Sequence, residues 1–443
     1  MPNGSYYVAT NGSDSNPGTA SAPWLTLQKA ANSAPSGATI VVRSGTYAGF
    51  TLAKAGTPSN PTVFMADPSG SRPILDGAIG SRLDVVKFGA TAHDAQISGF
   101  VITNAQGGNS TGSGIRTESG SSHIVISNNV VRNNHSFGIN SYNSNDITIR
   151  DNDVSGNEEG IQIAHAGAGT VILDNLVHEN NQMLVNTPTS VDAHDDAGAT
   201  AIGFLKTTGP VLASGNTVWG NRAPSDDFTW DGSAFDIYGA SNVTITDNVM
   251  WDNENVFETG TDSGVACNNN VFAHNVAYGD ATQGRAWGAF IRCGDNMVVA
   301  NNTFSGIEGF VFSIGEDSAR FSGTLDGLHV VNNVIAVSDT GARVFGLTTA
   351  LPASVVIDYN LLTTTGQVAQ LPDGRSTLDM ATFTSWTGYQ VHGVDADPMF
   401  VNAADDDYRL RAGSPAVDSG ESVPGVTVSW SGSHPDIGRF EQP

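Results

Sequence analysis

Residues 123–134 read HIVISNNVVRNN, residues 146–157 read DITIRDNDVSGN, and residues 169–180 read GTVILDNLVHEN. The three segments follow one another at intervals of 23 residues, and each contains a β-branched strand, an asparagine, a second short strand and a second asparagine. A unit of this length that repeats along a chain is typical of a solenoid, in which each coil stacks on the next. The repeat predicts stacked coils of short parallel strands with asparagine at the corners.

The two corner asparagines recur along most of the chain. The first corner is occupied by Asn129, Asn152, Asn175, Asn216, Asn248, Asn270, Asn302 and Asn333, and the second by Asn134, Asn157, Asn180, Asn221, Asn253 and Asn275. Side-chain amides at equivalent corners are expected to hydrogen-bond from coil to coil. Leucine-rich repeats need a leucine framework that is missing here, and propellers need longer repeats, so a parallel β-helix remains.

A third strand follows each pair of corners and carries one large apolar residue. These residues are Ile115, Ile139, Ile161, Ile202, Phe235, Phe257, Phe290 and Phe312. Because side chains alternate between the two faces of a strand, they are expected to form one inward stack. The residues that follow them are expected to form an outward column of Arg116, Asn140, Gln162, Gly203, Asp236, Glu258, Ile291 and Ser313.

Composition favours one elongated domain of strands and turns. Charged residues make up 14% of the 443 residues, glycine accounts for 51, and no linker divides the chain. We expect a single all-β domain over residues 1–443, with an N-terminal cap at about 1–38, coils at about 39–400 and a closing segment at about 401–443. The net charge of −25, with 19 basic residues, argues against binding to nucleic acid, and no apolar run is long enough to span a membrane.

Two cysteines, Cys267 and Cys293, lack the spacing of a metal site. They form either one disulfide between neighbouring coils or two buried thiols. The first residues contain no basic and apolar leader, so we interpret the chain as a mature protein whose signal peptide has been replaced. Secretion to the extracellular space is therefore expected.

The coils and both ends of the chain resemble the pectate-lyase-like superfamily of secreted right-handed parallel β-helices. Residues 6–18, YYVATNGSDSNPG, and 23–30, PWLTLQKA, are similar to the start of many members; DPMF at 397–400, GSPAVD at 413–418 and DIGRFE at 436–441 are similar to their end. The resemblance implies this fold, with a short capping helix within residues 25–34, and an enzyme that acts on carbohydrate. It selects no reaction, because the fold carries lyases, hydrolases, epimerases and fructotransferases.

Asp236 and Glu258 occupy the outward column on successive coils, where stacked strands lie about 4.8 Å apart. Two carboxylates held that close repel each other, so one of them is expected to keep its proton near neutral pH. A glycoside hydrolase needs such a pair as acid and as nucleophile or base. The alternative is a polar, solvent-facing sheet without a catalytic role.

Two long interruptions of the repeat precede Asp236. Residues 182–200 contain His194 and Asp196, and residues 222–233 contain Trp230 and Asp231. Long loops inserted in a solenoid are commonly functional, so Asp231 and Asp196 are expected to be further catalytic carboxylates, unless they only cap turns. The residues expected to bind sugar are Gln162, Tyr238, Trp230, His194, Asn140, Lys206 and Asp262.

A calcium-dependent polysaccharide lyase is the main alternative. Carboxylate oxygens suit calcium, and the same two loops contain Asp192, Asp195, Asp196, Asp226 and Asp227, at a spacing that is not diagnostic. Several lyases of the superfamily use calcium to neutralise a uronate carboxylate, with Lys or Arg as the base. Lys206 lies in the middle of the coils, but strand alternation after Phe204 and Leu205 turns it inward or into a corner.

The sequence thus favours an extracellular glycoside hydrolase, or a related glycosyl transfer enzyme, that cleaves a poly- or oligosaccharide with Asp236 and Glu258 as its catalytic pair. This enzyme is expected to use no metal or cofactor, whereas the lyase would use Ca²⁺ and act by β-elimination on a uronic-acid polymer. A non-catalytic glycan-binding solenoid is the third hypothesis. A carbohydrate partner is expected in each case, and the sequence leaves the sugar, the linkage and the oligomeric state open.

Overall fold

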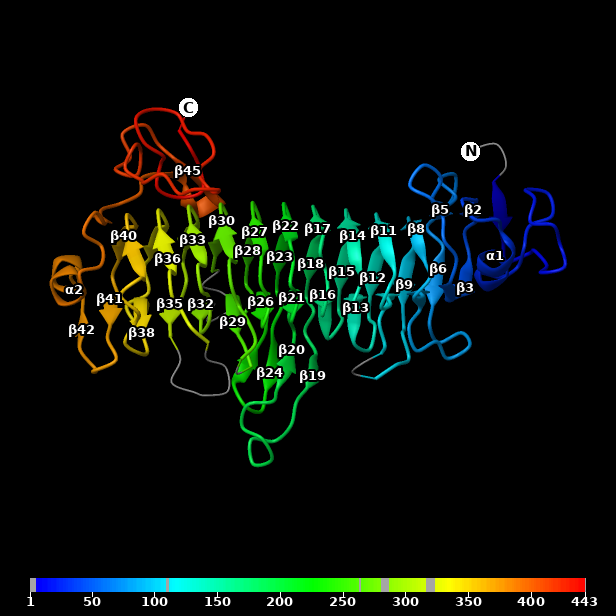
Figure 1. Ribbon diagram of the computed structural model, residues 1–443, viewed down its shortest axis with the longest axis horizontal. Helices are drawn as coiled ribbons and strands as arrows, with labels where there is room; N and C mark the ends of the chain where they lie inside the picture. Colours follow the sequence, from blue (N-terminus) through cyan, green and yellow to red (C-terminus); the bar gives the residue numbers. More distant parts are fainter. Residues whose placement is uncertain (1–4, 109–110, 263, 280–286, 316–322, 443) are drawn as a thin grey trace. The chain divides into compact units, whose positions relative to one another are not determined.

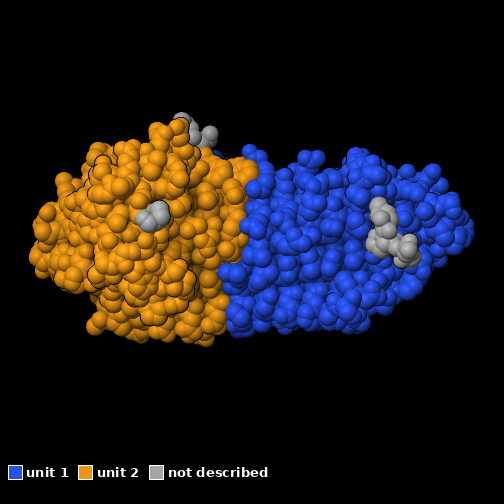
Figure 2. Space-filling model, turned by 90° about the horizontal axis from the view of Figure 1, so that it is seen from above, with its two compact units in different colours: residues 1–212, 220–232 blue, residues 213–219, 233–443 orange. Residues whose placement is uncertain are grey.

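The computed structural model describes residues 5–108, 111–262, 264–279, 287–315 and 323–442. Contacts group the chain into two compact units: unit 1 contains residues 1–212 and 220–232, and unit 2 contains residues 213–219 and 233–443 (Figure 2). The boundary falls within strand β22 (Val211–Ser214). Within each unit, successive coils place their strands side by side in three sheets, almost entirely by parallel pairing (Figure 1). The predicted all-β coil stack is confirmed.

Unit 1 contains the strands of the first coils. Its first sheet contains β1 (Tyr6–Val8), β2 (Thr39–Val42), β5 (Thr62–Ala66), β8 (His93–Ser98), β11 (Ser122–Ser127), β14 (Asn145–Arg150) and β17 (Thr170–Leu173). The second contains β4 (Phe50–Leu52), β7 (Val86–Phe88), β10 (Ile115–Thr117), β13 (Phe137–Tyr142), β16 (Glu159–Ala164) and β21 (Ile202–Leu205). The third contains β3 (Thr46–Ala48), β6 (Ile74–Asp76), β9 (Val101–Thr103), β12 (Val130–Arg132), β15 (Asp153–Ser155) and β18 (Leu176–His178).

Unit 2 continues the same pattern. Its first sheet contains β27 (Val243–Thr246), β30 (Val271–Ala273), β33 (Val298–Ala300), β36 (His329–Val331) and β39 (Val356–Asp358). The second contains β26 (Ser233–Tyr238), β29 (Asn255–Gly260), β32 (Trp287–Ile291), β35 (Phe310–Ile314), β38 (Arg343–Leu347), β41 (Gln367–Gln370) and the antiparallel β42 (Ser376–Thr377). The third contains β23 (Thr217–Trp219), β28 (Val249–Trp251), β31 (Val276–Tyr278), β34 (Thr303–Ser305), β37 (Val334–Val337), β40 (Leu361–Thr364) and β43 (Val394–Asp395).

Corner asparagines form the predicted ladders inside each unit. In unit 1, the Asn134 side-chain amide donates to Asn157 Oδ1 at 3.1 Å, and Asn157 donates in turn to Asn180 at 2.9 Å. In unit 2, Asn248 donates to Asn275 Oδ1 at 3.0 Å. Each Oδ1 also accepts the backbone amide of the preceding corner, so the side chain replaces a strand partner where the chain turns. Because each coil needs the same residue at the same corner, the ladder explains the asparagine repeat.

Helix α1 (Leu27–Ser33) lies at the N-terminal end of unit 1. The Thr26 hydroxyl accepts a hydrogen bond from the Lys29 amide at 3.1 Å and caps the first turn. Leu27 and Ala30 are buried, and the helix contacts β1 and β4. The capping helix expected within residues 25–34 is confirmed.

The predicted strand register is correct in unit 1 and wrong at one coil of unit 2. In β32, Ala289 occupies the inward stack, and Phe290 pairs with Glu258. Ile291 is fully buried. Phe290 rather than Ile291 therefore lies in the outward column, and Ala289 rather than Phe290 lies in the inward stack. The prediction failed because Phe290, a bulky aromatic residue, faces outward in β32.

The closing segment packs against the first and third sheets of unit 2 (Figure 1). It contains β44 (Phe400–Asn402), a 3₁₀ turn η1 (Ala403–Asp405) and β45 (Asp407–Leu410). Helix α2 (Met380–Thr387) precedes it and contacts β41 and β42. Val423 and Val426 lie on Ala273 and Ala300, strand residues of the first sheet. Among the described residues, no helix is long and apolar enough to cross a membrane.

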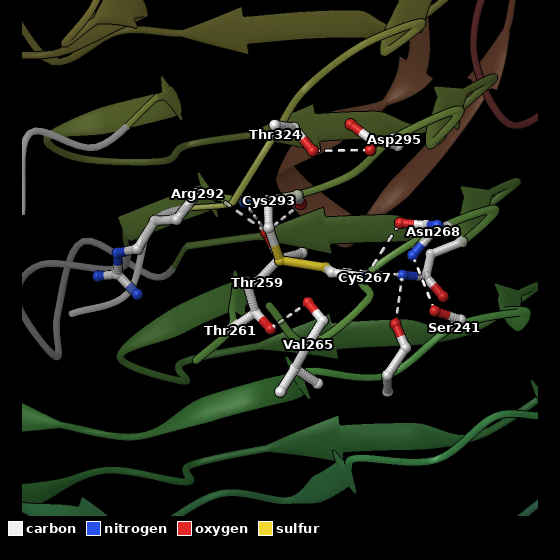
Figure 3. Close-up of a disulfide and its surroundings, with 12 residues drawn as sticks. Ser241, Thr259, Thr261, Val265, Cys267, Asn268, Arg292, Cys293, Asp295 and Thr324 are labelled. Carbon is white, nitrogen blue, oxygen red and sulfur yellow. Dashed lines mark hydrogen bonds between the residues drawn. A yellow bond between two sulfur atoms is a disulfide. The ribbon is translucent and has the colours of Figure 1, made fainter. Parts of the chain in front are cut away.

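Cys267 and Cys293 form a disulfide between neighbouring coils of unit 2, with their Cα atoms 6.0 Å apart (Figure 3). Thr259 supports it: its hydroxyl donates to the Cys293 carbonyl at 2.7 Å and accepts the Cys293 amide at 3.2 Å. The sequence left open whether the two cysteines form a disulfide or remain buried thiols, and the structure contains the disulfide.

We expect the double replacement Cys267→Ala and Cys293→Ala to lower the free energy of unfolding by about 3 kcal/mol, because the disulfide closes a loop of 26 residues. Thermal unfolding with and without reductant measures the effect: reductant should lower the midpoint of the wild type and leave that of the double variant unchanged. Equal midpoints for the two proteins without reductant would contradict this stabilising role.

Candidate active site

The outward column of the second sheet of unit 1 is built in register from coil to coil. Lys87 on β7 pairs with Arg116 on β10, and Arg116 pairs with Asn140 on β13. Asn140 pairs with Gln162 on β16, which pairs with Gly203 on β21. The predicted column is confirmed over these coils, and Lys87 extends it. We call these five residues the unit 1 column.

Two cations at the start of this column share one carboxylate. Glu118 Oε1 accepts from Lys87 Nζ at 2.7 Å and from Arg116 Nε at 2.9 Å. Burial acts to raise the pKa of Glu118, but Lys87 and Arg116 outweigh burial, and the pKa lies below its usual value. Two adjacent cations on one outer face are notable in a chain with a net charge of −25.

Lys206 directly follows strand β21, the strand that contributes Gly203. Its φ of 52° lies in the left-handed region, which residues other than glycine and asparagine rarely adopt. This conformation interrupts the alternation of the strand, so Lys206 lies at a corner, one of the two places that the sequence allowed. The side chain is partly exposed, whereas Phe204 is buried.

Two antiparallel hairpins project from the coils of unit 1 beside this strand (Figure 1). One pairs β19 (Met183–Val185) with β20 (Ala197–Gly198), and the other pairs β24 (Ala223–Ser225) with β25 (Thr229–Asp231). Strands β19 and β24 are in contact. Three residues separate the end of the first hairpin at Gly198 from Ile202, the start of β21, so the residues of this hairpin lie close in sequence to Lys206.

The hairpins bring Asp195, Asp196 and Asp227 together, with one oxygen of each within 4.8 Å of the others. Asp227 Oδ2 accepts the amide of Asp195 at 3.0 Å and that of Asp196 at 3.3 Å. Asp227 Oδ1 is buried and has no hydrogen-bond partner among the described residues. We call these three residues the carboxylate cluster.

Asp196 is the central member of the carboxylate cluster. Its Oδ1 accepts the Thr187 amide at 2.7 Å, and its Oδ2 accepts the Ser225 hydroxyl at 2.7 Å and the Asp227 amide at 3.0 Å. Burial acts to raise the pKa of Asp196, but these donors outweigh burial and hold the pKa below its usual value. The cluster therefore keeps a negative charge at its centre at neutral pH.

The other predicted loop residues lie outside this cluster. Trp230 is exposed, and the Arg222 guanidinium lies 4.5 Å from the centroid of its ring. Asp231 Oδ1 accepts the amide of Gly232 at 2.8 Å, as in a turn cap. The His194 ring is stacked at 6.4 Å on that of Phe228. Of the carboxylates that the sequence offered as catalytic residues or calcium ligands in these loops, the structure brings Asp195, Asp196 and Asp227 into one cluster.

In unit 2, Asp236 and Glu258 pair in register on β26 and β29, as predicted. Glu258 already has two partners: Oε2 lies 2.9 Å from Arg292 Nη1, and Oε1 accepts the Ser233 hydroxyl at 2.5 Å. Arg292 and Glu258 therefore form an ion pair beside the outward column of unit 2. Near by, the Tyr238 hydroxyl donates to Asp262 Oδ1 at 2.7 Å. The catalytic role of the pair stays a prediction.

Two buried glutamates, Glu158 and Glu159, are absent from the predicted site residues. Glu159 begins β16 and is 8% exposed, and the Gln162 side-chain amide donates to its Oε2 at 3.0 Å. Burial raises the pKa of Glu158 and that of Glu159 to about 7. The signal in the sequence is the pair itself: two adjacent acids stand where the preceding coil carries Ser136 and Phe137.

A cavity of about 470 Å³ lies elsewhere, between the first sheet of unit 2 and the closing segment. Thr244, His274 and Val426 are among its lining residues, and Arg439 and Asp247 form an ion pair of 2.7 Å there. None of the predicted site residues lines this cavity. The candidate active site is therefore the outer face of the second sheet and the hairpins beside it.

Comparisons with known proteins place the chain in a family. The family model of the Pel9A-like, right handed beta helix region matches residues 6–339. The crystal structure of pectate lyase Pel9A superposes with a TM-score of 0.52 and 18% identity, covering 99% of this chain and 96% of that chain. The structure of XylC with xylose gives a TM-score of 0.59 at 11% identity over 90% of this chain and 87% of that chain.

A curated relative is the uncharacterized protein YwoF of Bacillus subtilis (strain 168), which is 31% identical over 132 residues. This match covers 28% of this chain and 28% of YwoF. The two structural matches share the fold with this chain, and the family model spans most of its coils. The chain therefore belongs to the Pel9A-like right-handed β-helix family.

Proposed function

We propose that the protein is a calcium-dependent polysaccharide lyase that cleaves a uronic-acid polymer, such as polygalacturonate, by β-elimination. The observation that carries this proposal is the carboxylate cluster of Asp195, Asp196 and Asp227, which is held by the hairpins beside β21, the strand that Lys206 directly follows. Membership in the Pel9A-like family supports the proposal, because Pel9A is a pectate lyase.

The residues of the carboxylate cluster fit a calcium ion. Calcium takes carboxylate oxygens as ligands, and the cluster offers three within 4.8 Å of one another. The buried Asp227 Oδ1 lacks a partner among the described residues, and three converging carboxylates repel each other without a cation. When bound, calcium would neutralise a uronate carboxylate of the substrate and so make the adjacent C5 proton easier to remove.

The side chains of unit 1 supply the remaining chemistry. The amine of Lys206 takes the C5 proton, the electron pair of the C5–H bond forms the C4=C5 double bond, and the bond from C4 to the glycosidic oxygen breaks. Lys87 and Arg116 bind carboxylates of neighbouring sugars, because cations on the outer face attract an anionic chain. This assignment differs from the hydrolase that the sequence pattern favours, because Glu258 is held by Arg292 and Ser233.

The first test is incubation of the protein with polygalacturonate and calcium, while ultraviolet absorbance and reducing ends are followed in parallel. We expect both signals to rise together, because each elimination creates one unsaturated sugar and one new reducing end. Chelator should stop both, and a neutral polysaccharide such as xylan should give neither. Reducing ends without absorbance would contradict the lyase.

A glycoside hydrolase is the second candidate, and the in-register pair of Asp236 and Glu258 favours it. The same incubation with neutral and uronic polysaccharides distinguishes the two enzymes, since hydrolysis produces no double bond. Binding without any product would identify a glycan-binding protein. We also propose secretion, because disulfides such as that of Cys267 and Cys293 persist in oxidising compartments.

A further inference from the structure

Glu159 lies on the same outer face as the unit 1 column. Its Oε2 accepts a hydrogen bond from Gln162, a member of this column. The same oxygen lies 3.9 Å from the point that a Cβ atom on Gly203 would occupy. The carboxyl group of Glu159 therefore lies over a position without a side chain, between its own strand and β21.

The surroundings of Glu159 favour its protonated form. No described residue places a cation against its carboxyl group, and no described residue donates to Oε1. The charged group that acts on it is Glu158, whose own neighbour His135 lies 3.9 Å away. Phe137, its register neighbour on β13, and Thr200, which lies beside Gly203, carry no charge. Burial, followed by Glu158, raises the pKa of Glu159 to about 7 against the opposing effect of Gln162. Glu118, Asp196 and Glu258 all have cations or several donors instead.

The unit 1 column also offers a hydrogen-bond acceptor to a sugar hydroxyl group. Asn140 is 2% exposed, and its Oδ1 is buried and has no hydrogen-bond partner among the described residues. Asn140 is the register neighbour of Gln162, the residue that holds Glu159. A buried acceptor without a donor is costly, and a sugar hydroxyl can supply the donor.

We propose that Glu159 is the proton donor of the elimination, which gives its proton to the glycosidic oxygen as the bond to C4 breaks. Gln162 and Gly203 are positioning residues, because one holds the carboxyl group and the other leaves space for it. The inference rests on the proposed lyase function. It completes the proton balance: Lys206 takes the C5 proton, the glycosidic oxygen gains the Glu159 proton, and both groups exchange with solvent afterwards.

The positions along β21 leave room for one sugar between acid and base. Gly203 and Lys206 are three residues apart, so their backbones lie roughly 10 Å from each other at the rise of a strand. The Glu159 carboxyl group lies above Gly203, and Lys206 is at the far end of the strand. A pyranose ring placed between them presents the C5 proton to one residue and the glycosidic oxygen to the other.

The test is Glu159→Gln, assayed in the full-length protein with polygalacturonate and calcium chloride. Glutamine keeps the shape and can still accept from Gln162, but it has no acidic proton. We expect kcat to fall at least about 100-fold with KM within about threefold. Glu158→Gln is the matched control, because Glu158 is equally buried but does not contact Gln162, and it should keep kcat within about threefold of the wild type.

A pH profile separates proton donation from a structural role. Wild-type kcat should fall as the pH rises through the titration of Glu159, because the ionised carboxylate has no proton to give. Glu159→Gln should lack this alkaline limb, while Glu158→Gln should keep it at a lower pH, because the charge of Glu158 helps to raise the pKa of Glu159. Gly203→Val is a second variant in case Glu159→Gln folds poorly: its backbone is not left-handed, and the added methyl groups displace the Glu159 carboxyl group and should lower kcat.

The outcomes distinguish this inference from the function on which it rests. If the wild type forms unsaturated product and Glu159→Gln stays within about tenfold of it with an unchanged pH profile, Glu159 is not the donor and the lyase stands. If the wild type forms no unsaturated product from polygalacturonate, the lyase is wrong and the role of Glu159 in elimination falls with it.

Discussion

Replacing Lys206 with methionine is expected to lower kcat for cleavage of polygalacturonate by about 10²- to 10⁴-fold, because methionine keeps the length of the side chain but removes the amine that takes the C5 proton. The change should add no backbone strain at position 206, because a methionine and a lysine side chain are equally disfavoured by the left-handed conformation there. Ultraviolet absorbance of the unsaturated product measures kcat, and a thermal midpoint close to that of the wild type shows that the fold is intact.

Two other lysines provide the comparison. Lys87→Met should raise KM and change kcat little, because Lys87 lies in the unit 1 column, away from the corner of Lys206, and is proposed to bind a substrate carboxylate. Lys29→Met should change neither constant, because Lys29 lies on helix α1 in the N-terminal cap. If Lys206→Met keeps kcat within about tenfold of the wild type, Lys206 is not the base, and the pair of Asp236 and Glu258 becomes the next candidate.

The fold could be predicted from the sequence because the corner ladder demands the same residue in every coil. The side-chain carbonyl of Asn152, for example, accepts from Asn129 on the coil before it, and its side-chain amide donates to Asn175 on the coil after it. A hydrogen-bonded ladder therefore leaves a strict repeat in the sequence. The outward column of β10, β13, β16 and β21 followed from the same register.

The error in β32 has a packing cause. Phe290 faces outward, where its ring lies 5.7 Å from that of Trp287, and Trp287 lies 5.8 Å from Phe310. These aromatic residues pack on one another on the outer face, while the small Ala289 faces the core. A rule that places the largest apolar residue inside has no means of detecting such an outer cluster.

The candidate site could be predicted only in part, because its geometry depends on breaks in regularity. Lys206 lies at a left-handed corner, which alternation cannot place. Asp196 and Asp227 are 31 residues apart and meet only because two hairpins pack together. Glu159 is the first residue of β16 and does not belong to the outward column that the repeat predicts. Its proposed role rests on its hydrogen bond with Gln162, which the sequence alone does not indicate.

Calcium should raise the thermal midpoint of the wild type, and Asp227→Asn should remove this response. Binding to the folded state alone adds about 2.7 kcal/mol to the free energy of unfolding at a calcium concentration 100 times the dissociation constant. Asparagine at 227 can still accept the amides of Asp195 and Asp196 with its oxygen, and its new amide group takes the place of Oδ1, which has no partner among the described residues. The hairpins should therefore keep their structure while the cluster loses one charge.

Without calcium, the variant should be as stable as the wild type or slightly more stable, because one of three mutually repelling carboxylates is gone. This opposite sign in the two conditions separates loss of a metal ligand from general damage to the hairpins, which would lower the midpoint in both. Asp226→Asn is the matched control: the neighbouring Asp226 is exposed and does not belong to the cluster, so its calcium response should equal that of the wild type. Magnesium should not replace calcium, since it prefers a strict octahedral shell and retains its waters. An undiminished calcium response in Asp227→Asn would remove the carboxylate cluster from the proposed mechanism and leave the lyase without its strongest structural argument.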